Sequence, residues 1–180
     1  IDHCLVGSEM CIRDSAENAG VRIVNMSMGS YSQDDWTCFH DGAKQHPHIL
    51  FVISAGNDGC DIDVNPVFPA SFDLENIVVV TSSDLFGRLP PQSNYGRVSV
   101  DLMVPAEQVD VFDHRGVFTT ASGSSFAAPR VAALAARFLK KNVEASTTDI
   151  IDFLKSRAIN SGSTPVRFGW IPDPSDDFKL

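Results

Sequence analysis

The chain has 180 residues, of which 43% are hydrophobic and 21% are charged, and its net charge is −9. This length and composition are typical of one globular domain with a buried core. The negative charge argues against a nucleic-acid partner and against docking on an anionic membrane, because both require clustered basic residues. The apolar runs are too short to span a bilayer, so we expect no membrane insertion.

Residues 1–15 differ from the rest of the chain. They follow neither the helical nor the strand period, and they resemble the translated adapter sequence that can contaminate the ends of assembled transcripts. We therefore expect a non-native head at 1–15, with the fold carried by 16–180. Two of the four cysteines lie in this head. The other two, Cys38 and Cys60, can form a disulfide in a secreted protein or remain free thiols.

The first elements of the fold form a strand–helix–strand unit. Residues 21–28 and 48–54 are mostly apolar, as strands covered on both faces are, and a short amphipathic helix capped by Ser32 is predicted between them, to Gln45. Two strands joined in this way are parallel, and ligands of such sheets bind beyond the carboxyl ends of the strands. The segments Ser27–Gly29 and Ser54–Asn57 should therefore border one crevice.

The later elements extend the same architecture. Glycine- and proline-rich loops separate two further apolar strands, a hairpin and two helices, the second of which has a Ser146–Asp149 capping box, before a tail with a short apolar piece. We predict them at residues 76–81, 98–104, 109–120, 125–141, 146–158 and 168–171. The chain is therefore predicted to be an α/β domain of three layers, with a mainly parallel sheet and helices on both faces.

Ser125 is the first candidate for chemistry. It lies where the glycine-containing turn of residues 121–124 enters an apolar helix, so its hydroxyl should sit in the positive field of a helix N-terminus. Local chemistry allows a plain helix cap or a nucleophile. Asn57 is the second candidate. Its side chain can donate to a developing oxyanion, or it can serve only as a turn residue beside Gly56.

Six blocks of sequence, in order, resemble the C-terminal half of the catalytic domain of subtilisin-like serine proteases, the subtilases. The last block, Gly-Ser-Ser-Phe-Ala-Ala-Pro, is similar to the family's nucleophile signature, in which the second serine attacks. The blocks lie at residues 24–29, 54–57, 68–80, 93–96, 100–102 and 123–129.

This resemblance implies a serine endopeptidase with a partial subtilisin-like fold and a polypeptide substrate. It implies that Ser125 is the nucleophile, and that the Asn57 side chain forms the oxyanion hole together with the Ser125 backbone amide. It also implies that one segment pairs with the substrate backbone and that two segments wall a side-chain pocket. These substrate-binding residues are Ser27, Met28, Gly29, Ser54, Ala55 and Gly56. Family analogy further implies a secreted or vesicular location.

The sequence departs from the family pattern in one important respect. Subtilases place an aspartate and a histidine before the serine, in Asp-Ser/Thr-Gly and His-Gly-Thr blocks, and neither block occurs here. We therefore expect a fragment of a protease that lacks its acid and base and is inactive alone. The alternative is a subtilase-fold remnant that binds peptides without cutting them.

One loop offers a possible calcium site. Asp58, Asp61, Asp63 and Asn65 bring oxygen ligands together, and several subtilases bind calcium in loops. However, Pro66 occupies the position of the EF-hand glycine and Phe72 that of the bidentate glutamate. We expect a solvated acidic loop and no cofactor.

Overall fold

The computed structural model describes residues 20–160, 162 and 164–175, so the predicted head at 1–15 lies outside the described residues. A five-stranded sheet in the order β1–β2–β3–β4–β7 forms its centre, and every neighbouring pair of strands is parallel. Its strands are β1 (Ile23–Met26), β2 (Leu50–Ser54), β3 (Ile77–Ser83), β4 (Leu102–Pro105) and β7 (Gly169–Trp170). The predicted α/β class is confirmed.

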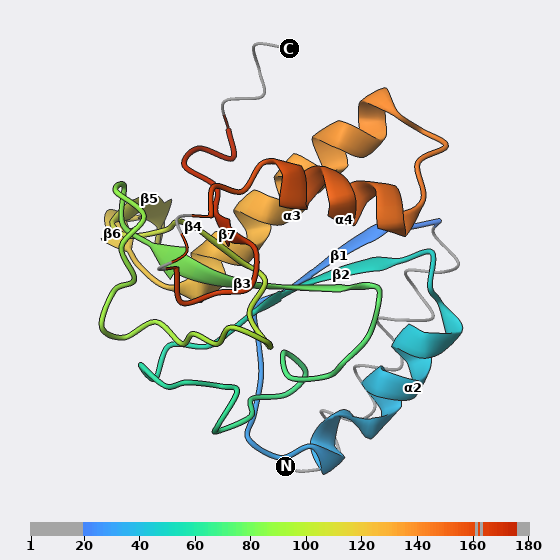
Figure 1. Ribbon diagram of the computed structural model, residues 1–180. Coiled ribbons are helices and arrows are strands. Elements are labelled where there is room, and N and C mark those ends of the chain that lie inside the picture. The colour runs from blue at the N-terminus through green and yellow to red at the C-terminus, as the bar shows by residue number, and fades with distance from the viewer. Residues whose placement is uncertain (1–19, 161, 163, 176–180) are drawn as a thin grey trace.

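Helices cover both faces of this sheet, which confirms the three layers (Figure 1). A 3₁₀ turn, η1 (Asp34–Trp36), leads into α2 (Thr37–Gln45) on one face, and α3 (Ser124–Lys141) and α4 (Thr147–Ser156) lie on the other. The side chains of β2 alternate between the layers: Phe51 and Ile53 join the core cluster that contains Phe39 of α2, whereas Leu50 and Val52 join the cluster of α3. All five residues of β2 are therefore buried.

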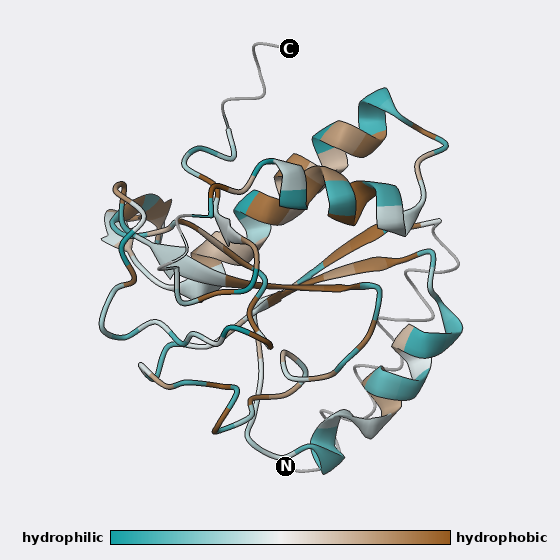
Figure 2. Ribbon diagram, in the orientation of Figure 1, coloured by the Kyte–Doolittle hydropathy of each residue, from teal (hydrophilic) through white to brown (hydrophobic). Residues whose placement is uncertain are grey.

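Apolar residues concentrate on the strands and on the helix faces that contact them (Figure 2). In α3 the predicted apolar face contributes Val131, Leu134 and Ala135, which are all fully buried. The capping box of α4 is also confirmed, because Ser146 Oγ accepts from the Asp149 backbone N–H and the Asp149 carboxylate accepts from the Ser146 N–H. Within the described residues, no helix is long and apolar enough to cross a membrane.

The predicted cap of the first helix is wrong. The helix begins as a 3₁₀ turn with Gln33 in the cap position and no side-chain cap bond. Ser30 replaces Ser32 as the local partner: its hydroxyl donates to Asp35 at 3.1 Å and accepts from the Trp36 indole N–H at 2.9 Å. The buried Trp36 indole is therefore bonded to Ser30, a residue that precedes the helix, and this bond holds the turn in place.

One strand boundary also differs clearly from the predicted one. The strand predicted from residue 98 begins only at Leu102, because the backbone N–H groups of Val98 and Ser99 donate to the Asp63 carboxylate instead of to a neighbouring strand. The short apolar piece near residue 170 forms β7, the edge strand of the sheet beside β4.

The carboxyl ends of the strands meet at one edge of the sheet, as predicted. Met26 of β1 pairs with Ile53 of β2, so the chain leaves both strands side by side. The predicted hairpin is present as antiparallel β5 (Val109–Phe112) and β6 (Phe118–Ala121), and it leads directly into α3. Cys38 and Cys60 are both free thiols in this structure.

Candidate active site

Ser125 lies in the first turn of α3, where a glycine positions it. Gly123 has φ of +129°, a conformation that residues with a side chain rarely adopt. A Cβ atom at Gly123 would lie 2.8 Å from Oδ1 of Asn57, so a side chain there would also displace Asn57. The turn therefore brings the start of α3 directly against the segment that follows β2. Ser125 itself is half-buried.

The Asn57 side chain is held by the residue before Ser125. Its Oδ1 accepts from the Ser124 backbone N–H at 2.8 Å and contacts the Ser124 hydroxyl at 3.1 Å. Because an amide oxygen that faces these donors points its own nitrogen the other way, Nδ2 of Asn57 is directed away from Ser124. The Ser124 hydroxyl also accepts from the Gly56 N–H at 3.1 Å, and Ser124 is fully buried. Sequence reasoning did not assign this role to Ser124.

The start of α3 leaves one backbone donor without a partner. The first N–H groups of a helix have no intrahelical acceptor. Here Phe126 and Ala127 donate to the Gly123 carbonyl, and Ser124 donates to Asn57. Within the described part of the chain, neither the Ser125 N–H nor Nδ2 of Asn57 has a hydrogen-bond partner. Both donors belong to residues next to Ser124: Ser125 follows it in the chain, and Asn57 is hydrogen-bonded to it.

Pro129 explains why the segment after β1 forms a hydrogen bond with Ser125. Pro129 lies inside α3, four residues after Ser125, and it has no N–H to donate to the Ser125 carbonyl. That carbonyl accepts instead from the Ser27 hydroxyl at 3.0 Å, and Asn25 Nδ2 lies 3.3 Å from the same hydroxyl. The missing helical bond thus becomes a bond between α3 and the segment after β1.

The predicted substrate-binding residues occupy two neighbouring segments at this edge. Met28 and Gly29 are exposed and Ser27 is half-buried, whereas Ser54 and Ala55 are buried and can offer little more than backbone. The six residues Ser27, Met28, Gly29, Ser54, Ala55 and Gly56 are thus brought together, beside Asn57 and Ser125.

A buried asparagine from a distant loop supports the second segment. Oδ1 of Asn94 accepts from the backbone N–H groups of Asp58 and Cys60 at 2.9 and 3.0 Å, and its Nδ2 donates to the Ala55 carbonyl at 2.9 Å. Asn94 is fully buried. One side chain therefore fixes the turn on both sides of Asn57.

Comparison with known proteins decides the family. A model of the subtilase family matches residues 8–170. The chain belongs to the subtilase family. It is 30% identical over 154 residues to alkaline elastase YaB of Bacillus sp. (strain YaB), covering 86% of this chain and 39% of that protein. It is 27% identical to subtilisin-like protease 1 of Plasmodium berghei (strain Anka), covering 89% of this chain and 29% of that protein.

Solved structures agree with this assignment. The self-cleaved protease domain of PatA gives a TM-score of 0.77 at 25% identity, over 98% of this chain and 67% of that one. A cold-adapted subtilisin-like serine proteinase gives 0.69 at 29% identity, over 83% of this chain and 54% of that one. The chain spans less than half the length of the two curated relatives above.

The four histidines among the described residues of this subtilase chain lie away from Ser125. His46 and His48 precede β2 and therefore lie at the amino edge of the sheet, separated from Asn57 by the five-residue strand, roughly 16 Å of extended chain. His40 lies within α2, and His114 lies in the turn of the β5–β6 hairpin. None of the four is on a segment that contacts Ser125.

The acidic loop has an internal role. Asp63 accepts from the backbone of Val98 and Ser99 at 3.0 and 2.8 Å, and Asp61 accepts from the Asp63 N–H at 3.0 Å. Burial alone would raise the pKa of Asp63, but the hydrogen bonds from Ser99 and Val98 lower it below its ordinary value. Over residues 20–160, 162 and 164–175, no group of three His, Cys, Asp or Glu side chains could hold a metal ion.

Proposed function

We propose that this chain is the nucleophile-bearing part of a serine endopeptidase that hydrolyses peptide bonds through an acyl-enzyme. The observation that carries the proposal is the pair of unpartnered donors, the Ser125 N–H and Nδ2 of Asn57, beside the Ser125 hydroxyl. Donors held in place before reaction stabilise an oxyanion without reorganising, and they matter most at the corner where the nucleophile attacks.

In the proposed reaction, Ser125 Oγ attacks the carbonyl carbon of the substrate as its proton passes to a base. The carbonyl oxygen becomes an oxyanion and accepts from Nδ2 of Asn57 and the Ser125 N–H. The tetrahedral intermediate then expels the amine, which takes up the proton, and leaves an acyl ester on Ser125. Water attacks this ester in the second half-reaction and releases the acid.

The described residues provide the positioning for this chemistry, but none of their histidines lies on a segment that contacts Ser125. Of these histidines, two are fixed at the opposite edge of the sheet. We therefore propose that the aspartate and histidine come from subtilase sequence that these 180 residues do not contain, and that this chain alone is inactive. The substrate is a polypeptide whose backbone pairs with the segment Ser27–Gly29. The reaction requires no cofactor.

A reactive-serine probe tests this proposal. A fluorophosphonate should not label the 180-residue chain. It should label a longer protein in which the chain is preceded by its own upstream coding sequence, and Ser125→Ala should abolish that labelling. Ser122→Ala is the matched control, since Ser122 is exposed and three residues away. In the longer protein, Asn57→Ala should reduce kcat by about 10²–10³-fold, the range found for the corresponding asparagine of subtilisin.

The alternative, a peptide-binding module, is favoured by the positions of the four described histidines, none of which lies on a segment that contacts Ser125. It predicts that the upstream sequence lacks Asp-Ser/Thr-Gly and His-Gly-Thr blocks and that the longer protein is not labelled either. Labelling that persists in Ser125→Ala would contradict the assignment of the nucleophile. Labelling of the 180-residue chain itself would contradict the claim that its base is missing.

A further inference from the structure

The direction of the Asn57 amide depends on the backbone that carries it. Ser124 bonds only to the oxygen of this amide, at 2.8 and 3.1 Å, so the direction of Nδ2 also depends on where the backbone of Asn57 lies. That backbone belongs to residues 55–60, which follow the end of β2 and form neither helix nor strand. We call residues 55–60 the Asn57 turn. Contacts from other segments must hold it in place.

Asn94 contacts the Asn57 turn on both sides of Asn57. Its side chain makes three hydrogen bonds, to residues 55, 58 and 60, and its backbone N–H donates to the Gly56 carbonyl at 3.2 Å. Gly56 has φ of +98°, and a Cβ atom there would lie 2.5 Å from Nδ2 of Asn94, so the turn passes the amide with no room for a side chain. The nearby Gln92 carbonyl accepts from the Gly59 N–H at 2.9 Å. Both ends of the turn are thus bonded to the same short loop.

Asn94 is itself attached to the middle of the sheet. The hydroxyl of Thr81, in β3, donates to the Asn94 carbonyl at 2.5 Å. The adjacent residues, Ser82 and Ser93, are hydrogen-bonded to each other through their hydroxyls. Thr81, Ser82 and Ser93 are fully buried, so water does not compete for these bonds. Because β3 is paired with β2 on one side and β4 on the other, the Asn57 turn is tied to a strand that is held on both sides.

An asparagine suits this position because the turn offers both donors and an acceptor. Oδ1 of Asn94 accepts from two backbone N–H groups, and Nδ2 donates to a carbonyl. A carboxylate of the same size can only accept, and an aliphatic side chain can do neither. The neutral amide therefore holds the turn on both sides of Asn57 without placing a charge in the interior.

We propose that Asn94 is a positioning residue for the reaction, which holds the Asn57 turn so that Nδ2 of Asn57 meets the oxyanion formed at Ser125. Asn94 is fully buried, so it acts through Asn57 and not on the substrate. Donors held in place before reaction lose their effect when they are displaced, and a misplacement of about 1 Å can cost about 10²-fold in rate. This proposal rests on the proposed function, because it assumes that Asn57 stabilises an oxyanion.

Kinetics of the longer protein, with its own upstream coding sequence, test the proposal. The substrate is the peptide p-nitroanilide that the unmodified protein cleaves best among a set of four-residue sequences. In Asn94→Ala we expect kcat to fall about 10- to 100-fold while KM changes by less than about threefold, because the lost positioning matters in the transition state. Rates are divided by the fraction of sites that a fluorophosphonate labels, so unfolded molecules are not counted. Asn65→Ala, at an exposed position, is the control and should leave both constants unchanged.

A second variant guards against loss of the fold. Thr81→Val keeps the shape of the side chain and leaves the bonds between Asn94 and the Asn57 turn in place, but it removes the bond that attaches Asn94 to β3. It should lower kcat by a smaller factor than Asn94→Ala, again with little change in KM.

The same two substitutions in an Asn57→Ala background show whether Asn94 acts through Asn57. The donor that Asn94 positions is then absent, so neither substitution should lower kcat further. An unchanged kcat in Asn94→Ala, losses that multiply in the double variants, or a rise in KM with kcat unchanged would each overturn this proposal alone. A longer protein that cleaves none of the p-nitroanilides and is not labelled would overturn the proposed function, and this proposal with it.

Discussion

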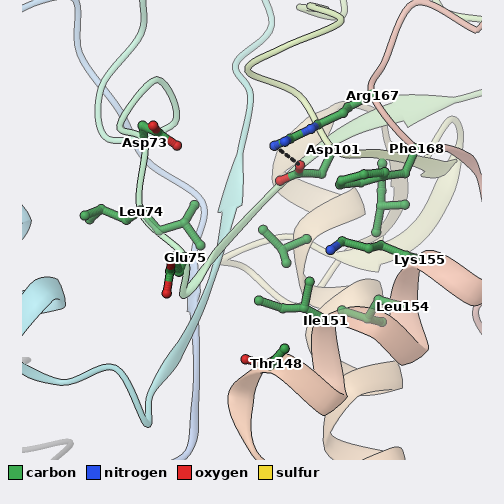
Figure 3. Close-up of a pocket in the computed structure, with 13 residues that line it drawn as sticks. Asp73, Leu74, Glu75, Asp101, Thr148, Ile151, Leu154, Lys155, Arg167 and Phe168 are labelled. Atoms are coloured by element: carbon green, nitrogen blue, oxygen red, sulfur yellow. Dashed lines mark ion pairs between the residues drawn. The ribbon is translucent and has the colours of Figure 1, made fainter.

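The two edges of the parallel sheet both carry polar side chains, but they use them differently. At the carboxyl edge, Asn57 and Ser124 satisfy each other and leave two donors facing outward beside Ser125. At the amino edge, the Asp101 carboxylate accepts from the Val79 N–H at 2.9 Å and lies 3.9 Å from the Arg167 guanidinium (Figure 3). One edge therefore carries two donors that no described residue pairs, whereas at the other a largely buried carboxylate accepts a backbone hydrogen bond and lies beside an arginine.

The amino edge also contains the clearer cavity. A pocket of about 380 Å³ is lined by the starts of β3 and β4, by α4 and by the Arg167–Phe168 segment (Figure 3). Lys155 and Arg167 both lie over the Phe168 ring, at 4.9 and 5.0 Å from its centroid, so these cations are engaged by neighbours already. This cavity therefore lies at the edge opposite Ser125, and the cations that line it already have an aromatic partner.

The largest effect should come from removing the support of the carboxyl edge. Asn94→Ala deletes three hydrogen bonds of a fully buried amide and leaves two backbone N–H groups and the Ala55 carbonyl unsatisfied. We expect the free energy of unfolding to fall by about 3–5 kcal/mol. Urea unfolding would measure it.

An exposed asparagine in the preceding loop provides the control for this change. Asn65→Ala removes an amide of the same size whose side chain makes none of these bonds, and it should change stability by less than about 0.5 kcal/mol. Similar losses in the two variants would show that the turn around Asn57 does not depend on Asn94.

The next effect concerns the amino edge and depends on pH. Burial raises the pKa of Asp101 to about 6, although the Val79 N–H, Arg167 and Lys155 oppose the shift. Because the folded state holds this proton more tightly than the unfolded state, the site stabilises the fold most at low pH, and stability is lost as the pH rises from about 4 to about 6. The loss is about 3 kcal/mol for a shift of about two pKa units.

Asp101→Asn should remove this dependence. The amide oxygen can still accept from Val79, but it does not titrate. The variant should therefore gain stability relative to the unmodified chain as pH rises from 4 to 7, by up to about 3 kcal/mol, in unfolding curves recorded at several pH values. Parallel pH profiles for the two proteins would show that Asp101 is not the titrating group.

The two edges also differ in how far the sequence predicts them. Apolar periodicity located the strands around β2 and β3 and the face of α3, because burial on both sides leaves a local pattern. The capping box of Ser146 was also predictable, because its partner Asp149 lies only three residues away. The resemblance to subtilases supplied Ser125 and Asn57 as candidates.

The supports of the site left no such local signal. Asn94 acts on residues 34 to 39 positions away, and Ser27 bonds to a carbonyl 98 positions away. The cap predicted at Ser32 failed because a buried indole, not the local pattern, decides how that helix begins. The edge strand β7 has only two residues, too few to show alternation.

The smallest effect tests the link between α3 and β1 at the carboxyl edge. Ser27→Ala leaves the Ser125 carbonyl without a donor, because Pro129 cannot supply one, and should reduce the free energy of unfolding by about 1–2 kcal/mol. In a Pro129→Ala background the new N–H can bond to that carbonyl within the helix, so the same Ser27 substitution should cost less. A double-mutant cycle measures this coupling. Additive effects would mean that the proline does not create the need for Ser27. A smaller cost of the Ser27 substitution in the Pro129→Ala background would show that the hydrogen bond missing at Pro129 is what links the Ser125 backbone to the segment predicted to bind the substrate.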